Sequence, residues 1–502
     1  MKKAMLLFGF ALIFLTRSVY AEAGFPLWTN IYLGSGSSQA RSLAVDTNGN
    51  AFIAGISAPD YLFVKYSNAG VALWTNRYRS SYFSTIRIVA NSTGDIFVAA
   101  SSVGTGSGFD FVTIKYSNSG LPLWTNRFNG LSNNADYATT LVADYEGGVI
   151  IGGNSIGVEG GYDYAAIKYS VAGIPLWTNW YDSPTHLNDF VTSAAIDRSN
   201  NVFVAGYSIP DSNIFLSTFF TIKYSRDGLA LWTNTVSRPI NWRIKPVVSI
   251  AVDSIGDVVV SGYGQQANPK PYGYLVVKYS NDGIPLWTNN FSTSTNSEIA
   301  VGMATDFRGN IIVTGYSTNA ASSSGSDFLT LAFAPTGMPL WTNRYTSSGA
   351  NHDVPSAIAI DGDGNSFVTG ASFNANLYTV LTVAYSLGGA PVWTNSYFFG
   401  VDDYFHATAI ASDPEGNVFV TGGAAIYQGY ATIKYAAFPA RLFNEKSNDG
   451  LILSWNNPAY GLACSPGLTA GFTMIPGATS PYTNFMEAGQ EFFRLISITN
   501  GP

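Results

Sequence analysis

Apolar and polar residues alternate in short runs along the first 440 residues, and the same order of runs returns about every fifty residues. Each unit begins with small and aliphatic residues that end in an acid, as in residues 193–197, followed by a turn and a second run such as 417–422. A loop of variable length leads to a third run such as 111–116, and a Ser-x-x-Gly turn leads to a fourth such as 121–126. No helical period competes with this alternation, so the pattern predicts four short β-strands per unit.

The tripeptide Trp-Thr-Asn marks the fourth strand of each unit, at intervals of 46 to 55 residues. A period near fifty residues with four strands is typical of a β-propeller blade rather than of a helical solenoid. The tripeptides begin at Trp28, Trp74, Trp124, Trp177, Trp232, Trp287, Trp341 and Trp393.

Residue type predicts where each strand lies within a blade. The first strand is rich in Ala and Ser, which suits the crowded position next to the axis of a ring. The fourth strand often carries proline, which cannot donate a hydrogen bond to a neighbouring strand and therefore belongs on a sheet edge. We expect the fourth strand at the outer rim, where these prolines occur: Pro26, Pro122, Pro175, Pro285, Pro339 and Pro391.

The number of blades follows from the acid, or its replacement, that ends the first strand. The last unit lacks a Trp-Thr-Asn strand, and the segment around Trp28 has such a strand without the three that should precede it. We therefore predict an all-β fold: an eight-bladed β-propeller over residues 24–438, closed by an N-terminal outer strand that completes blade eight. The eight positions are Asp46, Asn91, Asp144, Asp197, Asp253, Asp306, Asp361 and Asp413.

This pattern resembles the bacterial β-propeller repeat family known as SBBP. The matching features are the Asp-x-x-Gly-Asn turn (306–310 and 413–417), the Val-Thr-Gly run after it, Asp-Phe before the third strand (110–111 and 327–328), and Lys-Tyr-Ser before Gly-x-Pro-Leu-Trp. The resemblance covers about residues 25–438. It implies the fold far more than an activity, because members are mostly extracytoplasmic proteins without an assigned chemistry.

The repeat stops near residue 438, and residues 439–502 form a separate region. Residues 451–455 and 490–495 are predicted strands with Pro-Gly and Ser-Pro turns between them. The Leu-Ser-Trp opening and the Phe-Phe-Arg-Leu close resemble the short β-sandwich-type module that ends many secreted proteins of Verrucomicrobia. Such a module acts as a capping domain or as a sorting or attachment signal.

Charge and targeting restrict the class of protein. Charged residues are 11% of the 502 residues and the net charge is −7, without a basic cluster, which argues against a nucleic-acid partner. Residues 1–21 carry Lys2 and Lys3, an apolar run and a small-residue end, so we predict a secretory signal peptide and an extracytoplasmic location, periplasmic, surface or extracellular. No later run is long enough to be a transmembrane segment. Cys464 is the only cysteine and forms no intramolecular disulfide.

The aromatic residues have two interpretations. The Trp of Trp-Thr-Asn could stack on sugars, but a large ring at a fixed strand position favours packing between neighbouring blades. Trp180 and Trp242 depart from the repeat and fall in or near predicted loops, so we predict these two as candidates for ligand contact.

The acid at the first turn of each unit also has two interpretations. A carboxylate there can accept backbone N–H hydrogen bonds and cap the turn. In blade seven, Asp361, Asp363 and Asn365 alternate like the start of a calcium loop, which makes them a candidate calcium site, although the later bidentate Glu is missing. No other cofactor is expected.

A third set of acids lies eight residues before the turn acid, at the start of the innermost strand. Blade eight has Asp402 and Asp403 slightly earlier, and blade five has Lys245 in this place. These connections should gather at one mouth of the channel, where the side chains would bind a cation or a polyhydroxyl ligand; alternatively, the acids cap the starts of their strands. The acids of the set are Asp136, Asp189, Glu298 and Asp353, and the three histidines, His186, His352 and His406, fall in the same connections.

We therefore expect a secreted, non-enzymatic and monomeric protein that binds a protein, a glycan or an envelope component through its loop-rich face. The loops between second and third strands vary most in length, at residues 208–218, 265–272 and 318–326. The alternative is a glycan-active hydrolase or lyase that uses the carboxylates and histidines at the channel mouth. A third possibility is a purely structural part of the cell envelope. No catalytic-triad context, phosphate loop or zinc-helix motif is present.

Overall fold

The computed structural model divides into two compact units by its internal contacts, residues 24–438 and a second unit that includes residues 439–502. The predicted signal peptide, residues 1–21, lies outside the described residues. The described residues are 24–34, 38–80, 85–104, 106–157, 160–184, 186, 188–209, 217–236, 242–244, 249–266, 271–293, 296–319, 325–347, 352–374, 377–398, 406–423, 429–436, 442–446, 451–455, 460–466, 472–478, 482–484 and 492–497.

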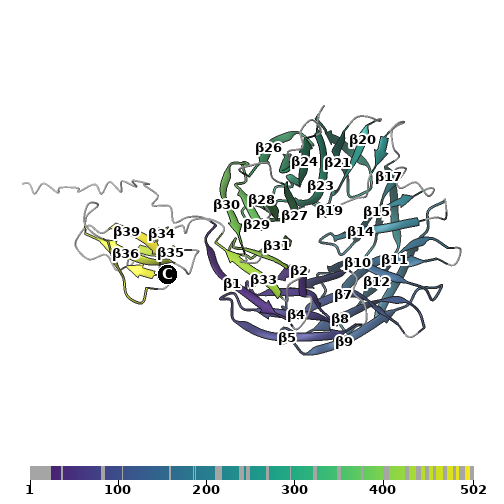
Figure 1. The fold of residues 1–502 in the computed structure, drawn as a ribbon, viewed down its shortest axis with the longest axis horizontal. Helices are drawn as coiled ribbons and strands as arrows, with labels where there is room; N and C mark the ends of the chain where they lie inside the picture. The colour runs from purple at the N-terminus through teal and green to yellow at the C-terminus, as the bar shows by residue number, and fades with distance from the viewer. Residues whose placement is uncertain are drawn as a thin grey trace, which may run out of the picture. The chain divides into compact units, whose positions relative to one another are not determined.

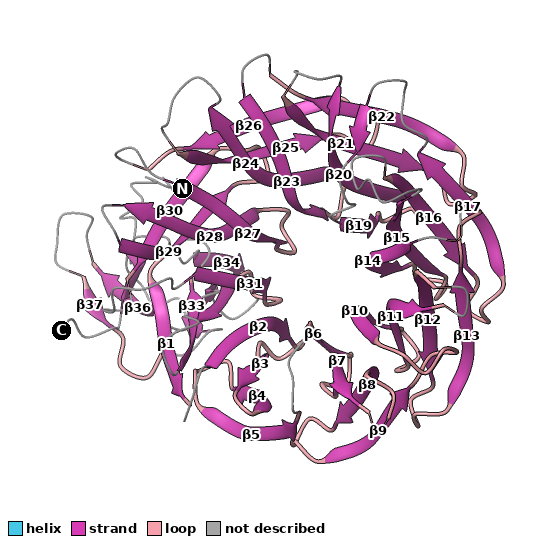
Figure 2. Ribbon diagram, turned by 45° about the vertical axis from the view of Figure 1, so that its right-hand side comes forward, coloured by secondary structure: helices cyan, strands magenta, loops and turns pink. Residues whose placement is uncertain are grey.

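The first unit is an eight-bladed β-propeller (Figures 1 and 2), as predicted. Blade one contains β2 (Ser38–Val45), β3 (Ala51–Ser57), β4 (Asp60–Tyr66) and β5 (Ala72–Arg79), and blade two contains β6 (Ile86–Ala90), β7 (Ile96–Val103), β8 (Phe109–Tyr116) and β9 (Pro122–Phe128). Blade three contains β10 (Asp136–Ala143), β11 (Val149–Ile156), β12 (Tyr162–Tyr169) and β13 (Pro175–Tyr181), and blade four contains β14 (Asn188–Ile196), β15 (Val202–Ile209), β16 (Thr218–Tyr224) and β17 (Ala230–Val236).

The remaining blades keep the same antiparallel order, except that the inner strand of blade five is split into two strands, β18 and β19, which both pair with β20. Blade five contains β18 (Trp242–Ile244), β19 (Ser249–Val252), β20 (Val258–Gln266), β21 (Tyr272–Tyr279) and β22 (Pro285–Phe291), and blade six contains β23 (Asn296–Thr305), β24 (Ile311–Asn319), β25 (Ser326–Phe333) and β26 (Pro339–Tyr345). Blade seven contains β27 (His352–Ile360), β28 (Ser366–Asn374), β29 (Leu377–Tyr385) and β30 (Pro391–Tyr397), and blade eight contains β31 (His406–Ser412), β32 (Val418–Gly423), β33 (Gly429–Tyr435) and β1 (Pro26–Leu33).

The core of the propeller lies between blades. Second and third strands are apolar on both faces and are buried along almost their whole length, as in β7 and β8. Phe97 and Phe111 of blade two belong to one buried cluster with Val149, Ile151 and Ile167 of blade three. Outer strands such as β9 alternate between exposed and half-buried residues, as expected for a rim strand.

The N-terminal strand closes the ring. Figure 1 shows β1, in purple, beside β33, in yellow-green, and the two strands pair antiparallel with Thr29 opposite Ile433. Backbone hydrogen bonds from Gly24 N to Ala436 O (3.0 Å) and from Ala436 N to Phe25 O (3.1 Å) extend the pairing to the end of blade eight. The predicted closure by an N-terminal outer strand is confirmed.

The Trp-Thr-Asn tripeptide joins each blade to the next. Trp177 Nε1 donates to Arg226 O (3.1 Å) and Asn179 Nδ2 donates to Gly228 O (2.8 Å) in the outer turn of blade four. Gly228 lies flat on the Trp177 ring, because a Cβ there would be 2.6 Å from Trp177 Cγ. The predicted packing of these tryptophans between blades is confirmed. The Asn-to-Gly hydrogen bond occurs at Asn30–Gly70, Asn76–Gly120, Asn126–Gly173, Asn179–Gly228, Asn234–Gly283, Asn289–Gly337, Asn343–Gly389 and Asn395–Gly24.

The second unit contains two small antiparallel sheets in its described residues, consistent with the predicted β-sandwich-like module. Leu453 and Leu462 form its buried cluster. One sheet has the order β34 (Leu442–Lys446), β35 (Leu451–Trp455), β38 (Tyr482–Asn484), and the other has the order β37 (Thr473–Met474), β36 (Tyr460–Ser465), β39 (Phe492–Ser497). In the described part of the chain, no helix has the length and apolar character needed to cross a membrane.

Candidate functional site

The four acids predicted at the channel mouth all lie within the first three residues of an inner strand and are buried. Asp136 begins β10, and Asp189, Glu298 and Asp353 lie in β14, β23 and β27. Their exposed fractions are 0 or 1%. A carboxylate at this depth needs hydrogen bonds or an opposite charge, because burial strongly disfavours an isolated charge.

The hydrogen bonds come from the connection that enters each strand. Asp136 accepts from Gly130 N (2.6 Å), and Asp353 accepts from Ser347 N (2.8 Å) and Oγ (2.9 Å), six residues earlier in each case. The connection into blade six is one residue shorter, and there Glu298 reaches Thr293 N (3.3 Å) and Oγ1 (2.8 Å) with a side chain that is one methylene longer. The side chain therefore changes with connection length, as expected for a cap.

The structure does not bring these four carboxylates together. The hydrogen bonds and charges that act on Asp136, Asp189 and Glu298 come from residues at their own blade junctions. Of the two interpretations in the sequence, capping of strand starts describes Asp136, Glu298 and Asp353. Asp189 differs, because two further carboxylates lie next to it.

Burial raises the pKa of Asp136 from its ordinary value of 3.8, partly opposed by hydrogen bonds from Ser155 and Gly130. A carboxyl group with a raised pKa in the folded state binds its proton more tightly when folded than when unfolded. This group's contribution to the free energy of unfolding is therefore largest near pH 4 and falls as the pH rises through the folded-state pKa.

We therefore expect the difference in unfolding free energy between the native chain and Asp136→Asn to shrink as the pH rises from 4 to 7. Urea unfolding at several pH values measures this difference. The exposed Asp227, which has a side-chain exposure of 86%, provides the control Asp227→Asn. A difference for Asp136→Asn that stays constant across this range would contradict the argument.

The predicted histidines lie in three different settings. His352 is exposed while Asp353 is buried, because consecutive strand residues point to opposite faces. His406 begins β31 and is half-buried, and Asp403 lies outside the described residues. His186 is exposed, and its Nδ1 lies 2.5 Å from Asp182 Oδ2.

Trp180 lies in β13, one residue before the strand ends. Its ring is 5.7 Å from that of Phe128 and packs against the cluster between blades two and three. Trp180 directly follows Trp-Thr-Asn in the outer strand, at the position that holds arginine in several other blades, and it lies opposite Ala165 of β12. Trp242 lies in the short strand β18, opposite Gln266.

The candidate calcium residues form a capped turn. Asp361 Oδ1 accepts from Asp363 N (3.0 Å) and Asn365 N (2.9 Å), and Asn365 Nδ2 donates to Asp361 Oδ2 (2.8 Å). Asp361 and Asn365 thus bond to each other, whereas calcium ligands direct their oxygens at a common centre. The same bonds join Asp306 to Asn310, so the blade-seven turn matches the capping interpretation.

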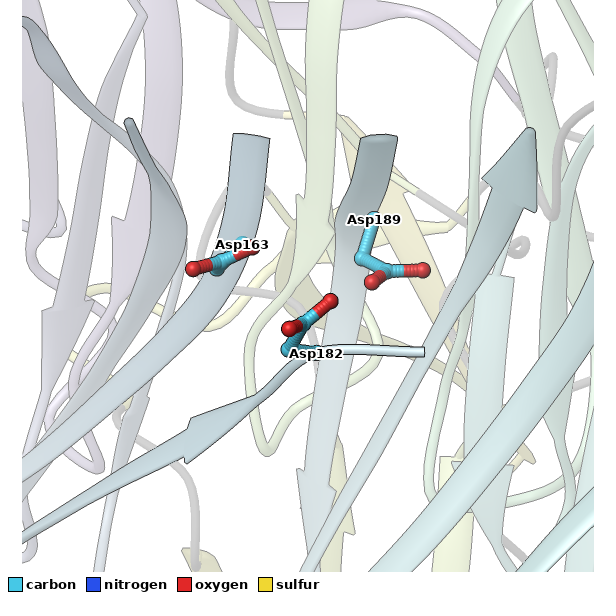
Figure 3. A group of neighbouring side chains, drawn as sticks. All are labelled: Asp163, Asp182 and Asp189. Atoms are coloured by element: carbon cyan, nitrogen blue, oxygen red, sulfur yellow. The ribbon is translucent and has the colours of Figure 1, made fainter. Parts of the chain in front are cut away.

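Three carboxylates gather at the junction of blades three and four, on the same face as the predicted mouth. Asp163 lies in β12, Asp182 follows β13, and Asp189 lies in β14, and one carboxylate oxygen of each lies within 4.8 Å of the others (Figure 3). Asp182 is exposed, Asp163 is half-buried and Asp189 is buried. Asp182 and Asp163 were not among the residues singled out from the sequence, because they belong to the blade before Asp189.

Two substitutions within the repeat produce this concentration of charge. In three other blades an outer-strand arginine pairs with the acid of the third strand: Arg77 with Asp60 (3.3 Å), Arg127 with Asp110 (2.9 Å), Arg344 with Asp327 (2.9 Å). Blade three has Trp180 at this arginine position. Two residues later it has Asp182, where blades two and six have Asn129 and Thr346.

A cavity of about 240 Å³ lies on the opposite face, at the turns between first and second strands. Tyr145, Arg198 and Phe307 contribute its large side chains, and Asp197 and Asp306 also line it. Tyr145 and Phe307 are 67% and 54% exposed. The sequence also distinguishes these three blades. The residue directly after the turn acid is Tyr145, Arg198 or Phe307 here, whereas the other five blades have Thr, Ser, Gly or Pro at this position.

Comparison with known proteins supports the repeat-propeller class. No protein-family model matches the chain, so its resemblance to the bacterial β-propeller repeat family stays a prediction. A WD repeat-containing protein of Acanthamoeba polyphaga mimivirus is 23% identical over 403 residues, which cover 70% of this chain and 27% of that protein. The chain thus spans about a quarter of the length of this relative.

Solved structures similar to the chain have low identity. Prolyl oligopeptidase B from Galerina marginata is 10% identical, with 78% of this chain and 56% of that chain covered and a TM-score of 0.45. PorZ, a surface component of the type-IX secretion system of Porphyromonas gingivalis, is 11% identical, with 91% and 68% covered and a TM-score of 0.42. The assignment of the chain as a repeat β-propeller rests on its own strand pairing.

Proposed function

We propose that this protein works outside the cytoplasm as a non-catalytic binding or scaffolding protein, with a protein, glycan or envelope component as its ligand. The observation that carries the proposal is the separate placement of the predicted acids. Asp136, Glu298 and Asp353 are each buried and hydrogen-bonded in a different junction. Glycoside hydrolysis needs two carboxyl groups about 5–10 Å apart across an open cleft, so these acids do not support the hydrolase alternative.

The loop-rich face is the proposed binding surface. The second and third strands of blade one are separated by residues 58–59 alone, whereas residues 210–217 separate those of blade four and residues 320–325 those of blade six. Unequal connections on an otherwise regular ring create a surface that differs from blade to blade, which is where propeller-like scaffolds place specificity. The exposed side chains of Leu131, His352 and Phe398 lie on or beside the connections of this face.

The outer rim gives a second reason to expect macromolecular contacts. In six blades, two apolar residues at the start of the outer strand are exposed by 47 to 68%. Repeated exposed apolar residues of this size are typical of surfaces that contact other macromolecules. These rim residues are Val71, Leu73, Leu121, Leu123, Ile174, Leu176, Leu229, Leu231, Ile284, Leu286, Met338 and Leu340.

The test compares binding and turnover on the same material. Residues 22–502 are incubated with isolated cell envelopes and a glycan array, and released reducing ends are measured in parallel. We expect binding without product release. A loop-face variant, Leu131→Ser with His352→Ala and Phe398→Ser, should bind at least roughly 10-fold more weakly, a loss of about 1.4 kcal/mol.

The control is a variant of the opposite face, Tyr145→Ala with Phe307→Ala, which should bind as the native chain does. Sugar release by the native chain would overturn the non-catalytic assignment. Loss of binding in the control variant alone would move the binding surface to the cavity that Tyr145 and Phe307 line on the opposite face.

A further inference from the structure

The junction of blades three and four has a buried oxygen that the capping role does not use. Asp189 is fully buried, its Oδ2 accepts from Ser183 N (2.6 Å), and its Oδ1 has no hydrogen-bond partner. Ser208 lies close enough to lower the pKa of Asp189, but it does not form a hydrogen bond of normal geometry with Oδ1. In blade three the corresponding oxygen, Asp136 Oδ1, accepts from Ser155.

Asp189 is buried beside a second acid, Asp182. Burial raises the pKa of Asp189 above its ordinary value of 3.8, and the charge of Asp182 raises it further, against the effect of nearby serines. A protein that keeps three acids in contact gains most from a counter-charge at the point they share.

The geometry points to a divalent metal site: we propose that Asp163, Asp182 and Asp189 bind one Ca²⁺ ion at the junction of blades three and four. Figure 3 shows an oxygen of Asp182 directed toward Asp189, with Asp163 on the neighbouring strand. The three ligand oxygens lie within 4.8 Å of one another. Two oxygens on opposite sides of Ca²⁺, each at about 2.3–2.6 Å, are separated by about that distance.

The donor set favours Ca²⁺ over smaller ions. All three donors are carboxylate oxygens, the preferred ligands of hard cations. Zn²⁺ sites usually contain nitrogen or sulfur ligands from His or Cys, and none of these three ligands is of that kind. His186 Nδ1 lies 2.5 Å from Asp182 Oδ2, and its backbone has a φ of 51°, so this connection holds the imidazole against Asp182. His186 is a positioning residue for that carboxylate.

Bound Ca²⁺ would cross-link three segments: the third strand of blade three (β12), the connection that follows its outer strand β13, and the inner strand of blade four (β14). This inference does not depend on the proposed binding function, because it concerns the stability and shape of one junction. Extracytoplasmic calcium modules bind with dissociation constants on the order of 0.1–1 mM, so 10 mM Ca²⁺ should nearly saturate the site.

The experiment uses the full mature chain after EDTA treatment and gel filtration. Isothermal titration with CaCl₂ should show one site per chain, and 10 mM Ca²⁺ should raise the unfolding temperature by a few degrees. Asp182→Asn, at a side chain that is 38% exposed, should fold normally and bind Ca²⁺ at least 10-fold more weakly. Asp327→Asn is the matched control, because Asp327 occupies the place of Asp163 in blade six and pairs with Arg344.

A second variant tests the charge argument separately. Trp180→Arg introduces the arginine found at this position in other blades, where it pairs with the third-strand acid. Its positive charge should compete with a cation, so Ca²⁺ should no longer raise the unfolding temperature of this variant. The absence of Ca²⁺ binding by the native chain would overturn the proposal. Undiminished binding by Asp182→Asn would do so as well, and an equal response to MgCl₂ would overturn the choice of ion.

Discussion

A variant that begins at residue 38 is expected to unfold at a temperature on the order of 10 °C below that of the chain with β1. The missing strand completes blade eight by pairing with β33. It also contributes Trp28, whose ring is 5.7 Å from Phe419, and Tyr32, whose ring is 5.7 Å from Tyr430. Loss of a packed aromatic side chain costs about 3–5 kcal/mol when the ring is fully buried, so two half-buried rings account for the expected shift.

The same truncation should promote association, because β33 becomes an unpaired edge that can pair with another chain. Differential scanning calorimetry measures the shift, and light scattering measures the association. A synthetic peptide of residues 24–33 added to the truncated chain should restore part of the unfolding temperature. The control Leu33→Ser changes a side chain that is 77% exposed and should leave it unchanged. An unaltered unfolding temperature after truncation would contradict a closing role for β1.

The fold could be predicted because every blade repeats the same local pattern. The alternation of apolar residues predicts the strands, the period predicts a blade, and the two incomplete units at the ends predict closure. Proline at the start of outer strands lies on a sheet edge, as predicted: β9, which begins with Pro122, is the last strand in the order β6-β7-β8-β9.

The side-chain roles were harder to predict when they depend on the neighbouring blade. Asn179 was interpreted only as part of a strand motif, yet its amide donates to Gly228 in the next blade. The lysine before each Tyr-Ser is similar: Lys278 is buried and its Nζ lies 2.8 Å from Asp253 Oδ2 and 3.3 Å from Pro335 O. The contacts of Asn179 with Gly228 and of Lys278 with Pro335 join residues 49 and 57 positions apart, and an alternation pattern contains no information about such contacts.

The candidate site was predictable in part. The recurring acids were correctly predicted at the starts of inner strands, but their complete burial was not predicted. The spacing of eight residues from the turn acid specifies where a side chain lies along the inner strand. It does not specify whether the carboxylate is hydrogen-bonded to water or to the connection that precedes its strand. The acidic cluster requires comparison across blades: Trp180 in place of arginine and Asp182 in place of Asn or Thr are visible only once the repeats are aligned.

The contact between tryptophan and glycine is expected to be the most sensitive joint between blades. Trp177→Ala removes a ring that packs in a buried cluster and donates to Arg226 O, which should lower the free energy of unfolding by about 3–5 kcal/mol. Gly228→Ala should cost about 3 kcal/mol, because φ is +86° and the new Cβ would lie 2.6 Å from Trp177 Cγ. Urea unfolding of both variants measures these losses.

A double-mutant cycle separates the two causes of the Gly228 effect. With Trp177 replaced by Ala, the new methyl group meets no ring, so Gly228→Ala should then cost only its backbone strain, about 1–2 kcal/mol. Gly106 is the matched control, because its φ is +82° and no atom lies within 4 Å of a Cβ placed there, so Gly106→Ala should cost the same backbone amount in the native chain. If the losses of unfolding free energy from Trp177→Ala and Gly228→Ala were strictly additive, contact with the Trp177 ring would not be the reason that position 228 requires glycine. We expect the two substitutions to be coupled, because the glycine backbone can approach the tryptophan only when the indole ring is flat and the glycine has no side chain. The same contact recurs at other blade junctions, for example at Gly120 on Trp74.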